Sequence, residues 1–453
     1  MSKNISQLQA LELFLVDVFT TQHLVNPLLM IGFSGGLDSS VMLHLLYQAR
    51  KKIPFKLHAH HVHHSLSPNA DTWALFCQEQ CSKLNIAFAI TKVQINKNSD
   101  LGLEAAARNA RYAALQAGNA DFVVLAHHQD DQAETLLLQL ARGAGVKGLA
   151  GMAMIDIKRK LLRPLLNMPR IALEDYAKQY KLTWIEDESN TDKQFNRNFM
   201  RHSVLPALGL RYPAIRQTLS RSAQHLAQTS HLIDDLAELD AKTCRFNFSE
   251  PSKLWLEPLE KLSVSRFSNC LRWWFNINNL QMPSDAQLQQ ITSQLLHAKA
   301  DSAIKIKLIE KTNDLKNLTL RRYQNFAYIV PDTFSNERIN LLWQGEETMI
   351  LPDNSRLFFS RKLGDGLSLR LVANAQLRIK NREGSERFKP EIGRPSRSLK
   401  VMLQTHEMPP WQRSQLPLIF IDETLVLIPN IAVDASLKAG AGELGLNVVW
   451  IES

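Results

Sequence analysis

The stretch with the most specific chemistry is F-S-G-G-L-D-S-S, residues 33–40. A short apolar run precedes it and a helical pattern follows, which predicts a turn between the carboxyl end of a strand and the start of a helix. Two glycines let the backbone turn sharply and approach a ligand, and the helix adds its positive end. Such a turn binds phosphate through backbone N–H groups. The predicted phosphate contacts are Ser34, Gly35, Gly36, Leu37, Asp38 and Ser39.

Asp38 places a negative charge inside this phosphate loop. A carboxylate repels phosphate unless a cation lies between them, so Asp38 predicts a Mg²⁺ ion bound to the phosphates. The alternative is that Asp38 caps the amino end of the helix, a position that Asp favours. No Lys follows the glycines, so the loop differs from G-x-x-x-x-G-K-[ST].

A second polar cluster is H-H-Q-D-D-Q-A-E-T, residues 127–135. Asp130 and Asp131 precede Glu134 by four and three residues, so either pair can share a helix face. Such carboxylates suit Mg²⁺ or a cationic substrate, although acids at a helix start are also favoured by the helix dipole. His127 lies at the end of a predicted strand, where it either contacts the nucleotide or packs internally. These residues are therefore candidates for catalysis.

The sequence H-A-H-H-V-H-H-S-L, residues 58–66, contains five histidines and raises the question of a metal site. Side chains of a strand alternate between its two faces, so these histidines cannot all converge on one ion. The alternative is a strand whose last residues, His61 to His64, border the ligand of the phosphate loop.

Strand and helix patterns alternate through the first 190 residues, which predicts an α/β fold with a doubly wound parallel sheet. Ligands of such sheets bind beyond the carboxyl ends of the strands, where both polar clusters lie. Helical spacing then predicts a mainly helical middle domain, and short strand patterns from about residue 304 lead to a small α+β domain. The predicted domains are 1–205, 206–335 and 336–453.

Composition limits the class of protein. Lys and Arg exceed Asp and Glu by 53 − 44 = 9 charges, which is compatible with an RNA partner. No apolar run approaches the length of a membrane span, so no membrane partner is expected. Four cysteines form no C-x-x-C pair and fit the reducing cytoplasm. A homodimer is compatible with these features, and the sequence does not decide the oligomeric state.

The S-G-G-x-D-S string resembles the pyrophosphate loop of the N-type ATP pyrophosphatases, which attach AMP to a substrate oxygen and release pyrophosphate. Further strings together resemble the tRNA(Ile)-lysidine synthase family within that superfamily. They are H-V-H-H-S-L (61–66), L-E-A-A-A-R-N-A-R-Y-A-A-L (103–115), residues 126–152, L-L-R-P-L-L (161–166), residues 184–206 and residues 396–419.

This resemblance implies a reaction. ATP adenylates the 2-carbonyl oxygen of the wobble cytidine of CAU-anticodon tRNA(Ile), and the ε-amine of free L-lysine then displaces AMP to give lysidine. It places Arg108 near the ATP phosphates. It assigns Asp187, Asn190, Arg197, Asn198 and Arg201 to a second polar motif, and we expect all of these but Asn198 to bind substrate. A capped helix start would explain Asn190 equally well. Asp131 and Glu134 are our candidates for the pocket that binds the lysine ammonium.

A basic and aromatic stretch near the carboxyl end predicts contacts with tRNA, since such side chains bind RNA backbone and bases. A solvated charged face is the alternative. The candidate residues are Arg394, Arg397, Lys400, Trp411 and Arg413.

Two other functions are compatible with the scaffold. A tRNA thiolase would need cysteines for sulfur or for an iron–sulfur cluster. Cys77 and Cys81 are expected on a helix away from the nucleotide end of the sheet. A non-catalytic nucleotide sensor or RNA-binding protein is the second alternative, and the complete set of Asp38, Asp130 and Glu134 argues against it.

Overall fold

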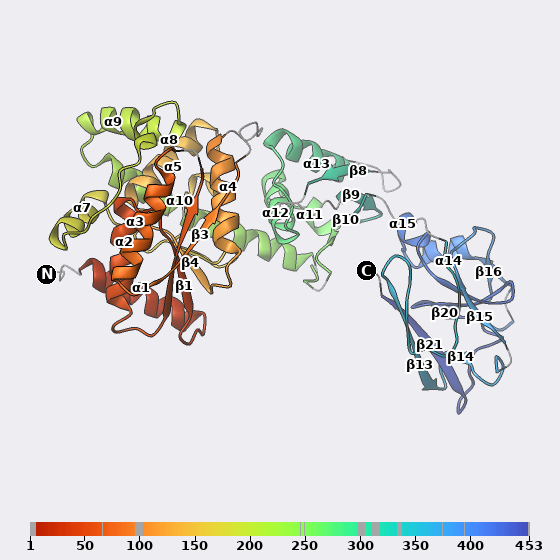
Figure 1. Ribbon diagram of the computed structural model, residues 1–453. Coiled ribbons are helices and arrows are strands. Elements are labelled where there is room, and N and C mark those ends of the chain that lie inside the picture. The colour runs from red at the N-terminus through yellow and green to blue at the C-terminus, as the bar shows by residue number, and fades with distance from the viewer. Residues whose placement is uncertain are drawn as a thin grey trace. The chain divides into compact units, whose positions relative to one another are not determined.

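The structure is a computed structural model, and Figure 1 shows its course. It describes residues 6–65, 67–95, 103–244, 246–248, 250–297, 304–309, 318–332, 338–373, 375–393 and 395–451. The chain forms two compact units, Met1–Ile233 and Asp234–Ser453, and each is described by itself. Among the described residues, no helix combines the length and apolar character that crossing a bilayer requires.

The first unit alternates strands and helices, as the sequence predicts. Its strands are β1 (Leu28–Gly32), β2 (Lys56–His63), β3 (Ala87–Lys92), β4 (Phe122–Val124), β5 (Ile155–Asp156) and β6 (Leu161–Leu162). Its helices are α1 (Gln7–Thr21), α2 (Leu37–Ala49), α3 (Ala70–Lys83), α4 (Leu103–Gln116), α5 (Gln129–Ala141), α6 (Val146–Leu149), α7 (Arg170–Gln179), α8 (Asn196–Phe199) and α9 (Leu205–Arg211). Helix α10 (Ile215–Thr243) begins in this unit, and the turns η1 (Glu188–Thr191) and η2 (Met200–Val204) precede it.

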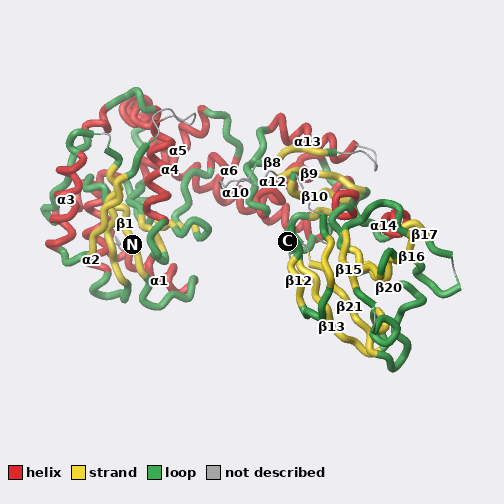
Figure 2. The backbone as a smooth tube through the Cα atoms, turned by 45° about the vertical axis from the view of Figure 1, so that its right-hand side comes forward, coloured by secondary structure: helices red, strands yellow, loops and turns green. Residues whose placement is uncertain are grey.

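The sheet of this unit has the strand order β3-β2-β1-β4-β6-β5. All neighbours pair in parallel except β5 and β6, which pair antiparallel at one edge. Helices α2 and α3 lie on one side of the sheet and α4 on the other (Figure 2). This arrangement confirms the predicted doubly wound parallel sheet. Strands β5 and β6 were not among the predicted strands.

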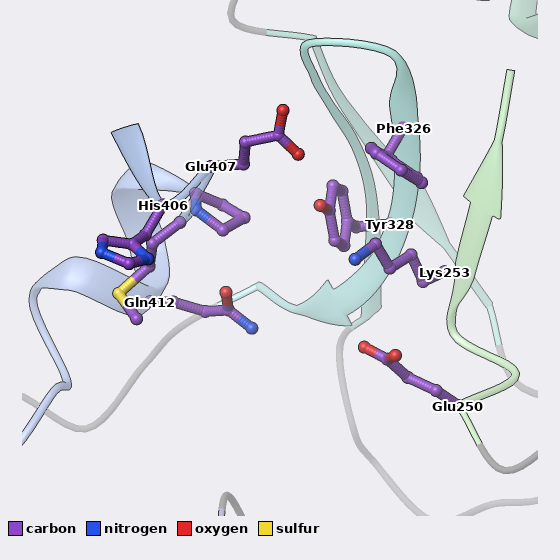
Figure 3. A pocket seen from close by; sticks show the side chains of 9 residues that line it. Glu250, Lys253, Phe326, Tyr328, His406, Glu407 and Gln412 are labelled. Carbon is purple, nitrogen blue, oxygen red and sulfur yellow. The ribbon is translucent and has the colours of Figure 1, made fainter. Parts of the chain in front are cut away.

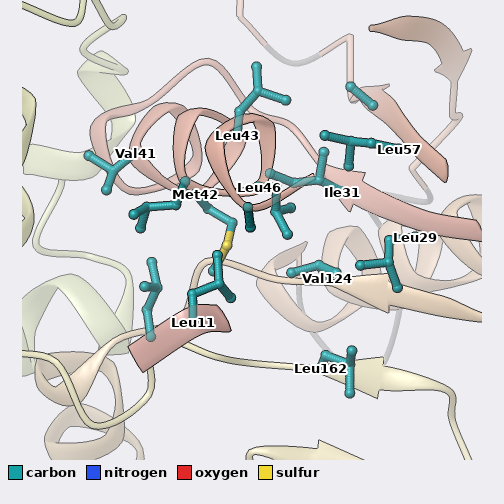
Figure 4. Packing of buried hydrophobic residues seen from close by; sticks show 14 of the residues in the cluster. Leu11, Leu29, Ile31, Val41, Met42, Leu43, Leu46, Leu57, Val124 and Leu162 are labelled. Atoms are coloured by element: carbon teal, nitrogen blue, oxygen red, sulfur yellow. The ribbon is translucent and has the colours of Figure 1, made fainter. Parts of the chain in front are cut away.

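The core explains why these segments fold this way. Central strands are apolar on both faces because helices cover both sides of a parallel sheet. Figure 4 shows Met42 and Leu46 of α2 packing toward Ile31 and Val124 of the sheet. Met30 belongs to a second cluster on the α4 side. This packing fixes the amino end of α2 beside the carboxyl end of β1, where the phosphate loop lies.

The second unit begins with helices α11 (Glu257–Glu260), α12 (Val264–Ile277) and α13 (Asp285–His297). They pack with an antiparallel sheet in the order β7-β10-β9-β8. Its strands are β7 (Lys253–Trp255), β8 (Lys305–Leu308), β9 (Leu318–Tyr323) and β10 (Phe326–Pro331). Strand β7 lies in the region that the sequence predicts to be helical, so the middle region is mixed at this point.

The rest of the second unit is rich in strands, as expected for the α+β region. The sheets have the orders β11-β15-β18-β19-β20 and β12-β13-β21-β14, and β16 pairs with β17. The strands are β11 (Asn340–Leu342), β12 (Thr348–Ile350), β13 (Arg356–Leu363), β14 (Leu367–Ser368), β15 (Leu377–Lys380), β16 (Arg387–Phe388), β17 (Arg397–Ser398), β18 (Leu418–Ile421), β19 (Thr424–Ile428), β20 (Ala432–Val433) and β21 (Leu444–Ile451). The helices are α14 (Leu399–Thr405) and α15 (Pro410–Arg413). The predicted fold class is confirmed, whereas the domain boundaries stay predictions.

Candidate active site

The loop between β1 and α2 has the shape that phosphate binding requires. Gly35 has φ of +83°, a conformation that side chains with a Cβ rarely adopt. A Cβ added to Gly35 would lie 2.9 Å from Ile185 Cδ1 and 3.0 Å from Cys77 Sγ. The Gly35 carbonyl accepts a hydrogen bond from the Ile185 amide at 2.9 Å. Ile185, which follows β6 in the sequence, therefore supports the backbone of the phosphate loop.

The serines of the loop are held by the loop itself. The hydroxyl oxygens of Ser34 and Ser39 lie 3.0 Å apart, and the Ser39 hydroxyl also donates to the Gly36 carbonyl at 3.0 Å. The Gly36 amide lies 3.4 Å from the Ser34 hydroxyl. This network orients both hydroxyls at the positive end of α2, where an anion is stabilised.

Asp38 is the second residue of α2, and the helix is capped by Gly36. The alternative interpretation of Asp38 as the capping residue is therefore wrong. Its Oδ2 lies 3.5 Å from His128 Nε2, whereas its Oδ1 is buried and has no hydrogen-bond partner among the described residues. A buried carboxylate oxygen without a donor is costly unless a ligand satisfies it. Asp38 thus fits the hard oxygen ligand that Mg²⁺ takes beside phosphates.

His128, and not only His127, belongs to the site. It precedes α5 as its N-cap: His128 Nδ1 accepts from the Asp130 amide, and Asp131 accepts from the His128 amide. Its Nε2 lies 3.5 Å from both Asp38 Oδ2 and Asp131 Oδ2. Burial lowers the pKa of His128, but the three carboxylates outweigh burial and raise it. The sequence analysis selected only His127 from H-H-Q-D-D, whereas the structure also places His128 in the site.

The two acids of the second cluster lie against two arginines. Glu134 is fully buried and accepts from Arg197 Nε at 2.8 Å and from Arg201 Nε at 2.6 Å. Asp131 accepts from Arg197 Nη2 at 2.9 Å and from Arg201 Nη2 at 3.1 Å. Burial raises the pKa of Asp131, but His128 and Arg197 outweigh it and hold the pKa well below its usual range. We call these four residues the ionic clamp.

The ionic clamp joins two motifs that the sequence analysis treated separately. Asp131 and Glu134 project from α5, while Arg197 lies on α8 and Arg201 on η2. The structure brings these four candidates together. It also fills the coordination of both carboxylates with guanidinium groups, which weighs against an open pocket for a lysine ammonium at this point.

Asp130 lies apart from the clamp. Its Oδ2 accepts from Arg216 Nε at 2.8 Å, and its Oδ1 accepts from the Arg170 amide at 3.3 Å. These partners belong to α10 and α7. Asp130 therefore ties α5 to two other helices, and its catalytic role stays a prediction.

A group of positive side chains faces His127. Burial lowers the pKa of His127 well below its usual value, and Arg111, Arg163 and Arg197 lower it further against the opposing effect of Asp131. The imidazole is therefore neutral at pH 7, and its Nδ1 is buried without a hydrogen-bond partner among the described residues.

Arg111 and Arg163 each carry a buried Nε atom without a partner among the described residues. Arg108 lies on α4 beside Tyr112, with its Nη2 3.4 Å from the phenol oxygen. Buried cations are normally paired, so this group suits an anionic ligand such as the phosphates of a nucleotide. The prediction for Arg108 fits this setting.

The remaining polar candidates follow β6 in the sequence. Asp187 is partly buried, and its charge opposes the lowering of the pKa of His64 to about 4, which burial and Arg111 cause. Asp187 therefore lies near His64, the residue that follows β2. The side chain of Asn190 lies outside the described residues, so its predicted role stays a prediction.

Comparison with known proteins gives the family. The description "PP-loop domain" matches residues 9–208, "TilS substrate binding domain" matches 254–328, and "TilS substrate C-terminal domain" matches 377–450. The tRNA(Ile)-lysidine synthase of Nitrosomonas europaea is 38% identical over 429 residues, which cover 93% of this chain and 91% of that protein. The chain belongs to the tRNA(Ile)-lysidine synthase family. The Coxiella burnetii member is 34% identical and is covered over 94% of its length.

Two solved structures show a weaker likeness to this member of the lysidine synthase family. The U34-tRNA thiolase NcsA from Methanococcus maripaludis has a TM-score of 0.38 and 20% identity, and the match covers 45% of this chain and 73% of that chain. An isolated TilS C-terminal domain has a TM-score of 0.21 and 13% identity, with 25% of this chain and 99% of that chain covered.

Cys77 lies closer to the lysidine-synthase phosphate loop than the sequence indicated. Its sulfur lies 3.9 Å from the Phe33 carbonyl and 3.5 Å from His61 Nδ1, directly beside Gly35. The expectation that it lies away from the nucleotide end is therefore wrong. Cys77 and Cys81 are nevertheless fully buried, and burial raises the pKa of each thiol to about 12. A thiolase needs a reactive thiolate, which neither residue provides.

The predicted RNA-binding residues have different environments. Arg397 and Lys400 are exposed at β17 and α14, and Arg394 lies outside the described residues. Arg413 is buried, and it donates to Tyr323 Oη at 2.6 Å and to the Met408 carbonyl at 2.7 Å. Trp411 packs edge-on against Tyr323. Both residues thus connect α15 to Tyr323 of β9, and their contact with RNA stays a prediction.

Proposed function

We propose that the chain ligates free L-lysine to carbon 2 of the wobble cytidine of CAU-anticodon tRNA(Ile), by way of an adenylated cytidine. Membership of the tRNA(Ile)-lysidine synthase family supports the substrates. The observation that carries the proposal is the phosphate loop, with Asp38 beside it and one carboxylate oxygen free to accept a ligand.

In the first step, the cytidine 2-oxygen attacks the α-phosphate of ATP, and pyrophosphate leaves. The amides and hydroxyls of the loop would orient the β- and γ-phosphates at the positive end of α2. Asp38 would hold Mg²⁺, which neutralises charge that develops on the leaving pyrophosphate. The positive group around Arg108 and Arg111 would hold the nucleotide phosphates from the α4 side.

In the second step, the ε-amine of lysine attacks carbon 2, the carbon–oxygen bond breaks, and that oxygen leaves with AMP. The amine must first lose a proton, because a free lysine ammonium has a pKa of about 10.4. His127 is neutral and has an unpartnered nitrogen, so it can accept a hydrogen bond from the incoming amine. We retain Asp131 and Glu134 as the proposed site of the lysine ammonium, which would have to displace a guanidinium group of Arg197 or Arg201 from these carboxylates.

The ionic clamp also has a structural role in this proposal. Arg197 and Arg201 follow the segment that supports Gly35, and their ion pairs to Asp131 and Glu134 fix that segment against α5. The clamp therefore keeps the loop, His128 and the positive group in one arrangement before substrate binds. Such preorganisation lowers the barrier because little needs to move during reaction.

Mass spectrometry of nucleosides tests the proposal. CAU-anticodon tRNA is incubated with the full chain, ATP, Mg²⁺ and lysine, and then digested. The proposal expects a cytidine that has gained the mass of lysine minus water. A gain of sulfur in exchange for oxygen would support a thiolase instead.

Because tRNA, ATP and free lysine occur together in the cytoplasm, we propose that the protein acts in that compartment.

A further inference from the structure

The second unit contains a pocket of about 210 Å³ that the proposed reaction does not use. One wall comes from β7 and β10 and carries Lys253, Phe326 and Tyr328, and the opposite wall is the turn between α14 and α15 (Figure 3). The pocket is smaller than the roughly 300–1,000 Å³ of sites for drug-sized ligands. It therefore has room for a single ring system.

The β10 wall of the pocket is aromatic and electron-rich. Lys253 Nζ lies 4.5 Å from the centre of the Phe326 ring and 5.7 Å from that of Tyr328. The two rings are tilted by 52° with centres 6.2 Å apart. An ammonium over such rings can swing aside on its flexible stem, after which the face of one ring is open for stacking, the tilted second ring borders it, and the lysine remains at the rim.

The rest of the lining is rich in hydrogen-bond acceptors. Glu250, Glu407 and Gln412 border the pocket, and Figure 3 shows Gln412 extending from the α15 side toward Tyr328. Burial raises the pKa of Tyr328, and both glutamates raise it further, so the phenol remains a donor. Two carboxylates beside an aromatic wall favour a ring that carries N–H donors and disfavour a bare phosphate.

Arg413 and Trp411 connect the two walls of the pocket. Arg413 donates to Tyr323 on β9 and to the Met408 carbonyl on the turn. Trp411 packs edge-on against Tyr328, with ring centres 5.4 Å apart and planes at 77°. These contacts fix the pocket in the absence of ligand, so a ligand would not have to order it.

We propose that this pocket binds one unstacked base of the tRNA, namely a base with an exocyclic amine. The inference rests on the proposed function for the identity of the RNA. The base would lie against Phe326 and Tyr328, its amine would donate to Glu250 or Glu407, and Lys253 would meet the attached phosphate. Single-stranded bases are commonly recognised by this combination of stacking and edge contacts.

Chemical probing of the complex tests the inference. Dimethyl sulfate and a carbodiimide together report the pairing edges of unpaired bases in CAU-anticodon tRNA, free and bound to the full chain. The test variant is Glu250→Ala with Glu407→Ala, which removes both carboxylate acceptors of the pocket. Glu346→Ala with Glu347→Ala, two exposed residues of the same unit that do not line the pocket, is the matched control.

We expect one adenine, cytosine or guanine to be protected by the wild-type chain and the control and to become reactive with the test variant. We also expect tRNA affinity to fall about tenfold in the test variant, as for lost hydrogen bonds to a charged group. The salt dependence of binding should not change, because no phosphate contact is removed.

Three results would overturn the inference: identical protection by all chains, protection of a uridine alone, or a reduced salt slope in the test variant. Lysidine formation is measured on the same samples. Normal lysidine formation without a protected base rejects the pocket alone, whereas failure of the wild-type chain to bind tRNA rejects the proposed function as well.

Discussion

Glu134→Gln distinguishes the two roles that the sequence and the structure give to Glu134. In the structure this carboxylate is fully buried and accepts three hydrogen bonds, from Arg197 Nε, Arg201 Nε and Arg201 Nη2. Gln keeps one acceptor but turns an amide N–H₂ group toward a guanidinium. Removing one partner of a buried ion pair costs about 3–5 kcal/mol, because the other charge stays buried.

This loss of free energy of unfolding corresponds to a lower melting temperature of the first unit. A unit of this size loses about 2–4 °C for each kcal/mol, so the expected fall in Tm is roughly 6–20 °C. The assay is differential scanning calorimetry of the full chain. The two units need not unfold together, so the transition of the first unit is identified as the one that ATP shifts.

Glu174→Gln serves as the matched control. Glu174 pairs with Arg170 at 3.2 Å, four residues earlier on α7, and both side chains are partly exposed. Such pairs contribute about 0.3–0.5 kcal/mol, so the control should melt close to the wild type. If Glu134→Gln melts like the control while the lysine KM rises at least about tenfold, the clamp interpretation is refuted and Glu134 belongs to a lysine pocket.

The remaining predictions concern the loop, the clamp and the basic surface. Asp38→Asn should abolish Mg²⁺-dependent ATP–pyrophosphate exchange with bound tRNA while the Tm is kept; near-normal exchange would reduce Asp38 to a structural residue. The depressed pKa of Asp131 means that its ionised form stabilises the fold above about pH 4 and that this stability is lost as the pH falls further, so Asp131→Asn should show a weaker acid dependence of urea unfolding there. Replacing Arg394, Arg397 and Lys400 with Ala should reduce the salt slope of tRNA binding by about one unit per lost phosphate contact, with single-turnover rates kept at saturating tRNA. An unchanged slope would place the RNA surface elsewhere.

Local patterns predicted much of the first unit. The parallel sheet and the turn at Gly35 follow from apolar runs, glycines and helical spacing, all of which act over a few residues. Strands β5 and β6 were missed because they are two residues long and form only by pairing within the sheet. Strand β7 was missed for the same reason, since its three residues pair with a distant strand.

The contacts of the candidate site were harder to predict than its residues. Glu134 and Arg197 are 63 positions apart, and no local pattern states that they pair. The sequence therefore predicts carboxylates that are open to a ligand, whereas in the structure Arg197 and Arg201 occupy them. His128 was overlooked in favour of His127 because both follow the same strand, and only the capping geometry of α5 shows which imidazole faces Asp38.

Exposure was the second property that the sequence did not specify. Interleaved basic and aromatic residues suggested an RNA surface, yet Arg413 is buried against Tyr323. Cys77 was expected away from the nucleotide end, but α3 brings it beneath Gly35. In both cases the deciding factor is the packing of one element on another.

The central claim is that one site first adenylates cytidine and then transfers lysine to it. The most direct measurement uses ATP with a labelled α-phosphate and CAU-anticodon tRNA in the absence of lysine, followed by a chase with unlabelled ATP and lysine. The account predicts that the label first enters the tRNA and is then released as AMP in an amount equal to the lysidine formed. Lysidine formation without any labelled tRNA, or a label that stays on the tRNA after lysine is added, would contradict it.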